Sequence, residues 1–225
     1  SGSFPLLIKF LDAEDDLSVQ VHPDTEACKK MGAGEPKTEC WYIVAAREGA
    51  VIYKNLRKGV TREDFARAIR EGTAEKMLEA VEVKPGQCHF LPAGTVHSIG
   101  AGILICEVQT PSDTTYRVYD WNRLDESGKG RDLHIEQALE CIHFDQAGEE
   151  LPATTVGRLI NSEYFTVDKG HQAANCQLFL KAGHLRVLII ISGSGHIESS
   201  SNEITEFKKG QTLLIPAEFE GAMEL

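Results

Sequence analysis

Short apolar runs separated by turn-forming residues constrain the fold of this chain more than any other feature. Gly, Pro, Asp and Asn repeatedly interrupt the runs, which cover residues 5–11, 17–22, 40–45, 51–53, 79–83, 88–91, 103–109 and 114–121. A high density of short strands and tight turns is typical of β-sandwiches and β-barrels. The pattern therefore predicts a mainly β protein.

Helical periodicity is confined to a few short stretches. Thr61, with an acidic residue three positions later, has the pattern of an N-cap, and Phe65 and Ile69 begin an apolar stripe. A shorter helix is expected around Met77, and another over residues 134–142. The prediction is a few short helices added to a β framework.

A weak internal repeat divides the chain. Residues 86–97 read GQCHFLPAGTVH and residues 210–221 read GQTLLIPAEFEG, with the same interval between glycine and proline. We therefore expect two related barrels, a first domain over residues 1–143 and a second over residues 144–225. Because Gly221 stands in the place of His97, only the first barrel is expected to bind a metal.

Charge and cysteine usage limit the partners and the compartment. The formal net charge of −11 argues against nucleic acid and anionic membranes. The longest apolar runs are too short to span a bilayer, and Ser1-Gly2-Ser3 has no signal-peptide character. Six cysteines without CxxC spacing predict reduced thiols and a cytoplasmic protein.

Four polar residues are expected within reach of one metal ion. Alternate residues of a strand share a face, so Gln20 and His22 point the same way, and Glu39 and His97 lie on neighbouring strands. Two imidazoles, a carboxylate and an amide oxygen suit zinc and also admit other divalent metals.

Two further polar residues are expected beside this metal. Ser18 shares its strand face with Gln20 and His22, and Lys37 shares its face with Glu39. A hydroxyl and an ammonium next to a cation could hold a phosphorylated or otherwise anionic ligand. The sequence thus predicts a metal site with a place for an anionic substrate.

Several motifs resemble known families. Gly86, Pro92, Gly94 and His97 have the spacing of a conserved box of the cupins, small jelly-roll barrels with a metal inside. More specifically, four ordered blocks resemble the short bacterial form of the type I mannose-6-phosphate isomerases: LIKFLDAEDDLSVQVHP, KTECWYIV, FLPAGTVHSIG and EVQTPSDTTYRVYDWNR. The resemblance covers residues 4 to about 139 and implies two cupin-like jelly-roll β-barrels, trimmed at both ends relative to the family.

The resemblance also implies roles for particular residues. It implies one zinc ion per chain held by Gln20, His22, Glu39 and His97, phosphate contacts from Ser18 and Lys37, and catalysis by Arg117, Lys9, Glu107 and Asp113. A lysine of the long eukaryotic form has Arg123 at its spacing, so that role does not carry over. The catalytic base stays open among Lys9, Glu107, Asp113 and a water on the metal.

The implied function is a zinc-dependent aldose-ketose isomerase that interconverts mannose 6-phosphate and fructose 6-phosphate through an enediol. Such an enzyme would act in carbohydrate metabolism as a monomer or weak homo-oligomer. The alternatives are a non-enzymatic cupin that senses sugar phosphates and an isomerase paralogue for another phosphosugar. An iron dioxygenase fits less well, because such a site typically has histidine where this chain has Gln20.

Overall fold

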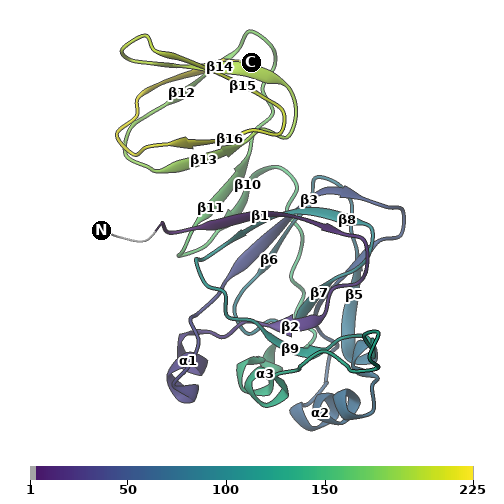
Figure 1. Cartoon of the computed structure of the whole chain (residues 1–225). Helices are drawn as coiled ribbons and strands as arrows, with labels where there is room; N and C mark the ends of the chain where they lie inside the picture. The colour runs from purple at the N-terminus through teal and green to yellow at the C-terminus, as the bar shows by residue number, and fades with distance from the viewer. Residues whose placement is uncertain (1–3, 225) are drawn as a thin grey trace. The chain divides into compact units, whose positions relative to one another are not determined.

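The computed structural model describes residues 4–224 and confirms a mainly β fold with a few short helices (Figure 1). Ser1-Gly2-Ser3 and Leu225 lie outside the described residues. The chain divides into two compact units, residues 1–169 and 170–225.

This division lies later in the chain than the expected boundary between residues 143 and 144. The hairpin of β10 (Gly157–Asn161) and β11 (Thr166–Lys169) belongs to the first unit. Its apolar residues pack in one cluster with Cys40 and Cys88 of that unit. The sequence after the last helix predicts strands, but it does not say on which core those strands pack.

Besides the β10–β11 hairpin, the first unit contains two facing antiparallel sheets. One has the order β1 (Leu7–Ala13), β8 (Ile103–Gln109), β3 (Glu39–Ala46) and β6 (Cys88–Leu91). The other has the order β5 (Leu78–Glu82), β4 (Val51–Leu56), β7 (His97–Ile99), β2 (Val19–Val21) and β9 (Tyr116–Tyr119). Trp41 and Ile105 from the first sheet share a buried cluster with Ile52 and Ile99 from the second. The space between the sheets is therefore a packed core.

Three α-helices lie at one end of the first unit in Figure 1: α1 (Thr25–Met31), α2 (Arg62–Arg70) and α3 (Ile135–Cys141). Two 3-10 helices accompany them, η1 (Ala74–Met77) and η2 (Phe144–Gln146). The predicted N-cap is confirmed, because the Thr61 side chain accepts the Asp64 N–H. Helix α1 was not expected from the periodicity. Among the described helices, none is long and apolar enough to cross a membrane.

The second unit is a smaller β structure. Its four-stranded sheet has the order β12 (Gln177–Leu180), β17 (Gly221–Glu224), β14 (Ser194–Ser199) and β15 (Ile204–Lys208). A two-stranded sheet pairs β13 (Arg186–Ile189) with β16 (Thr212–Ile215). Its core consists of Leu180, Ile197, Phe207 and Ile215.

The internal repeat is visible in the hydrogen bonds of the two units. Gly86 and Gly210 have φ values of +92° and +87°, and each donates its N–H to a backbone carbonyl oxygen at 2.8 Å. The side-chain oxygens of Gln87 and Gln211 each accept a backbone N–H from three residues earlier, at 2.7 Å. The two turns therefore have the same construction, and glycine serves their left-handed backbone conformation.

Lys54 and His89 are buried, titratable side chains of the first unit outside the predicted site. Lys54 donates to the carbonyl oxygen of Leu151 at 2.8 Å, and burial lowers its pKa to about 8. Neither ring nitrogen of His89 has a hydrogen-bond partner within residues 4–224. Burial, together with the charge of Lys54, lowers the pKa of His89 to about 4. The imidazole of His89 is therefore neutral in the folded protein near neutral pH.

His89 should make the stability of the protein fall as the pH is lowered. The unfolded imidazole binds its proton near pH 6.5 and the folded one only near pH 4, so stability is complete above the first value and is lost toward the second. Between pH 7.5 and 4.5 this loss amounts to about 2–3 kcal/mol. The variant His89→Leu should lack this contribution. Urea denaturation at both pH values tests it, and parallel pH dependences in the two proteins would contradict it.

Candidate metal and catalytic site

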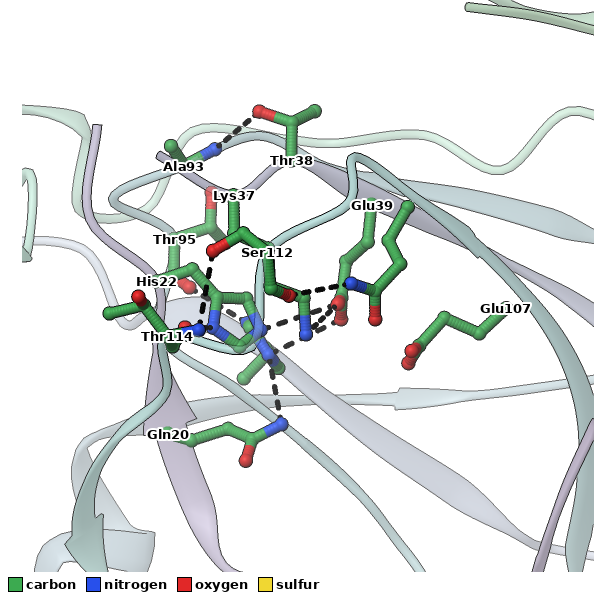
Figure 2. A network of polar contacts seen from close by, with 12 residues as sticks. Gln20, His22, Lys37, Thr38, Glu39, Ala93, Thr95, Glu107, Ser112 and Thr114 are labelled. Carbon is green, nitrogen blue, oxygen red and sulfur yellow. Dashed lines mark hydrogen bonds and ion pairs between the residues drawn. The ribbon is translucent and has the colours of Figure 1, made fainter. Parts of the chain in front are cut away.

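Three buried side chains converge between the sheets of the first unit (Figure 2). His22 directly follows β2, Glu39 begins β3 and His97 begins β7. One ligand atom from each lies within 4.8 Å of the other two. Their exposed fractions are 2%, 0% and 1%, so the cluster is shielded from solvent.

The polar atoms of this cluster lack ordinary partners. The Nε2 atom of His22 lies 3.3 Å from one Glu39 oxygen, and the Nε2 atom of His97 lies 3.5 Å from the other. Within the described part of the chain, neither Glu39 oxygen nor the His22 Nε2 atom forms a well-aligned hydrogen bond, although the Lys37 ammonium lies 2.9 Å from one Glu39 oxygen. Because buried polar atoms are normally hydrogen-bonded, these converging atoms fit a bound cation.

Backbone carbonyl groups set the orientation of both imidazole rings. The Nδ1 atom of His22 lies 3.0 Å from the carbonyl oxygen of Thr114, and the Nδ1 atom of His97 lies 2.8 Å from that of Thr95. A carbonyl oxygen only accepts, so each Nδ1 carries the hydrogen and each Nε2 keeps a free lone pair. Both lone pairs are thereby available to a metal.

The electrostatics favour the protonation states that metal binding requires. Burial alone would raise the pKa of Glu39, but His22, His97 and Lys37 lower it well below its ordinary value. Burial lowers the pKa of His97 to about 3, against the opposing effect of Glu39. At neutral pH the cluster therefore offers a carboxylate and a neutral imidazole at these two positions.

Gln20 is next to this cluster, as the strand alternation predicted. It pairs with His97 on one side and with Arg117 on the other, and its Nε2 atom lies 3.4 Å from the Nε2 atom of His97. Its neighbours Val19 and Val21 face away into an apolar cluster. The two ends of an amide are assigned from their contacts, and the oxygen is the end that binds a cation. Gln20 thus lies directly beside the three converging side chains.

The two expected substrate-binding residues are both buried. Ser18 immediately precedes β2 and is 5% exposed. Lys37 is also 5% exposed, and its ammonium lies 2.9 Å from the Glu39 carboxylate (Figure 2). The positive charge of Lys37 therefore stands at the cluster itself.

Lys9 on β1 and Glu107 on β8 form an ion pair across neighbouring strands. The Lys9 ammonium lies 3.2 Å from Glu107 Oε1, and the Trp41 indole N–H donates to Glu107 Oε2 at 3.2 Å. Burial and the charge of Glu39 raise the pKa of Glu107, while Lys37 and Lys9 oppose the rise. Glu107 is therefore a stronger base than an exposed carboxylate, which suits proton transfer.

Arg117 and Asp113 differ in their placement. Arg117 is the strand neighbour of Gln20, so its side chain leaves β9 on the face that carries the cluster. Burial and the charge of Arg131 lower the pKa of Arg117. Asp113 is exposed, and the described residues contain no hydrogen bond or ion pair from it to Lys9, Glu107 or Arg117. The structure thus joins Lys9 with Glu107, and among the described residues Asp113 takes no part in this pair.

Sequence reasoning missed two residues that support the site. Gln109 is fully buried and hydrogen-bonds Lys9, while Thr114 accepts the hydrogen bond from His22 through its backbone. The alternation that places Glu107 on the inner face of β8 also places Gln109 there, so Gln109 could have been found. A backbone contact such as that of Thr114 leaves no sequence signal.

Known proteins are similar to this chain in both sequence and fold. Residues 1–38 match the family described as phosphomannose isomerase type I, catalytic domain. Mannose-6-phosphate isomerase ManA of Bacillus subtilis is 41% identical over 226 residues, which is 95% of this chain and 69% of the relative. The crystal structure of the mannose 6-phosphate isomerase from B. subtilis superposes with a TM-score of 0.82 at 29% identity, covering 98% of this chain and 72% of that one.

A zinc-bound mannose 6-phosphate isomerase structure is a more distant neighbour. It superposes with a TM-score of 0.70 at 16% identity and covers 97% of this chain and 77% of its own. At this low identity the comparison shows similarity of fold only.

Proposed function

The chain belongs to the type I mannose-6-phosphate isomerase family, and we propose that it interconverts mannose 6-phosphate and fructose 6-phosphate with one zinc ion per chain. One observation carries the proposal: buried ligand atoms of His22 and Glu39 that lack hydrogen-bond partners converge with a ring nitrogen of His97, next to the Lys9–Glu107 pair. A cation site with a buried base beside it is the minimum that aldose-ketose isomerisation needs.

We assign the zinc to His22, Glu39, His97 and the amide oxygen of Gln20. This set of nitrogen and oxygen donors without sulfur is typical of zinc sites with catalytic roles. When bound, the ion supplies Lewis-acid stabilisation of the negative charge that develops on the sugar oxygens.

The reaction moves one proton from C2 of the aldose to C1 and a second proton between the oxygens of the same carbons. We assign the transfer of the carbon-bound proton to Glu107, because the pKa of its carboxyl is raised and the carboxylate is buried in the site. The contacts from Lys9 and Trp41 hold both Glu107 oxygens in place. Removal of the C2 proton gives an enediol, and its return to C1 gives the ketose.

The remaining charged residues would hold the substrate. Ser18 and Lys37 are the proposed contacts to the phosphate, and the position of Lys37 at Glu39 also suits charge stabilisation at the reacting end. Arg117, beside Gln20, would fix a sugar oxygen through its planar group of donors. Asp113 stays a candidate from the family motif alone.

A coupled assay of mannose 6-phosphate conversion to fructose 6-phosphate tests the proposal directly. We expect the full chain to turn over substrate, to lose activity with a chelator and to regain it when zinc is added. Absence of turnover by folded, zinc-loaded protein would favour a phosphosugar sensor. Turnover of a different phosphosugar in preference to mannose 6-phosphate would identify a paralogue.

A further inference from the structure

We propose that Gln109 is a positioning residue that holds the metal-binding and proton-transferring parts of the site in register. The inference deepens the proposed function and rests on it. Gln109 is the last residue of β8, is 0% exposed and stands directly opposite Glu39 in the β3–β8 pairing. It is therefore a strand neighbour of one proposed ligand without being a ligand itself.

The contacts of Gln109 define the orientation of its amide. Its Oε1 atom accepts from the Lys9 ammonium at 2.6 Å, and its Nε2 atom donates to the carbonyl oxygens of Thr110 at 2.9 Å and Ser112 at 2.8 Å. An ammonium only donates and a carbonyl oxygen only accepts, so the reversed amide would lose all three contacts. Both amide hydrogens and the oxygen are therefore in use.

One part of this network reaches the proposed base. The Lys9 ammonium donates to the Gln109 side-chain oxygen and also lies 3.2 Å from Glu107 Oε1. Because an amide is neutral, Gln109 binds the Lys9 ammonium and leaves its positive charge to pair with the Glu107 carboxylate. Lys9 thus stays paired with Glu107, whose second oxygen is held by Trp41 at 3.2 Å.

The other part of the network reaches a proposed metal ligand. Gln109 donates to the backbone carbonyl of Ser112. The Ser112 hydroxyl in turn donates to the Glu35 carbonyl at 2.9 Å and accepts the backbone N–H of Thr114 at 3.2 Å. The Thr114 carbonyl accepts from His22 Nδ1 at 3.0 Å, and Figure 2 shows Ser112 and Thr114 beside the His22 ring. Gln109 therefore fixes the loop that orients this imidazole.

The substitution Gln109→Glu keeps the shape of the side chain and removes this function. A carboxylate only accepts, so it would face the Thr110 and Ser112 carbonyls without a hydrogen bond and would draw Lys9 away from Glu107. We expect zinc affinity to fall about 10–100-fold, as it does for other residues that orient metal ligands. At saturating zinc, kcat should fall at least about tenfold with little change in KM, because the proposed phosphate contacts are untouched.

The test uses the full chain and measures zinc affinity by competition with a chelator, together with kcat, KM and the melting temperature. Gln87→Glu is the matched control, since the Gln87 oxygen only accepts a backbone N–H in an exposed turn and a carboxylate can do the same. Lys9→Met separates the two parts of the network, because it should lower kcat and leave zinc affinity unchanged.

Wild-type zinc affinity and kcat in a folded Gln109→Glu protein would overturn the inference. If that variant does not fold, Gln109→Met carries the test, with the same expected loss of zinc affinity and the same overturning result. Zinc affinity is measured without substrate, so its loss supports the positioning role even if the wild-type protein does not convert mannose 6-phosphate. A wild-type protein that binds zinc but does not convert mannose 6-phosphate would refute the proposed function and leave the positioning role of Gln109 standing.

Discussion

Glu39→Ala is expected to lose bound zinc and isomerase activity together. Glu39 is the only carboxylate of the converging cluster, and its two oxygens face both imidazoles and the Lys37 ammonium. Its loss should exceed the 10–100-fold effect on metal affinity that is typical of residues supporting the ligands. Zinc content after dialysis and the mannose 6-phosphate assay measure the two effects on the same sample.

Stability has to be separated from metal binding in this variant. Lys37 is 5% exposed, and removal of one partner of a buried ion pair costs about 3–5 kcal/mol. Glu39→Gln keeps an acceptor for Lys37 but not the negative charge, so it should fold better and still bind zinc weakly. Glu79→Ala, on the exposed side of β5, is the control for loss of a strand glutamate. A zinc-replete, active Glu39→Ala protein would refute the ligand assignment.

The face of β2 on which Gln20 lies could be predicted because a strand alternates its faces every two residues. That rule placed Gln20 opposite Val19 and Val21, and the structure has the two valines in the core and Gln20 beside His97. Thr61 as a helix N-cap followed from an equally local rule. Predictions of this kind depend on neighbouring residues alone.

Other features depend on contacts between distant residues and could not be read from the sequence. Helix α1 has no clear apolar stripe; it begins where the Asp24 side chain accepts the Ala27 N–H and ends at Gly32 with a φ of +63°. The 157–169 hairpin joins the first unit because its apolar residues match a surface of that unit. The exposure of Asp113 likewise depends on the conformation of the 110–114 loop, which Gln109 holds through the Ser112 carbonyl.

The different exposure of Glu107 and Asp113 leads to a prediction about the catalytic base. Glu107→Gln should lower kcat about 10²–10⁴-fold, the range that a positioned general base contributes, with zinc content unchanged. The variant is isosteric, but an amide cannot accept the proton from C2. Asp113→Asn should have a much smaller effect, because Asp113 is exposed and, within residues 4–224, forms no hydrogen bond or ion pair with Lys9 or Glu107.

Isotope exchange distinguishes loss of the base from loss of binding. Wild-type enzyme in deuterated water should place solvent deuterium at C1 of fructose 6-phosphate, and Glu107→Gln should slow this exchange in proportion to kcat, with KM nearly unchanged. If Asp113→Asn instead lost the exchange while Glu107→Gln retained it, the proton would move through Asp113. Glu107 would then serve to hold Lys9, and the raised pKa of its carboxyl would reflect its burial beside Glu39 without a part in proton transfer.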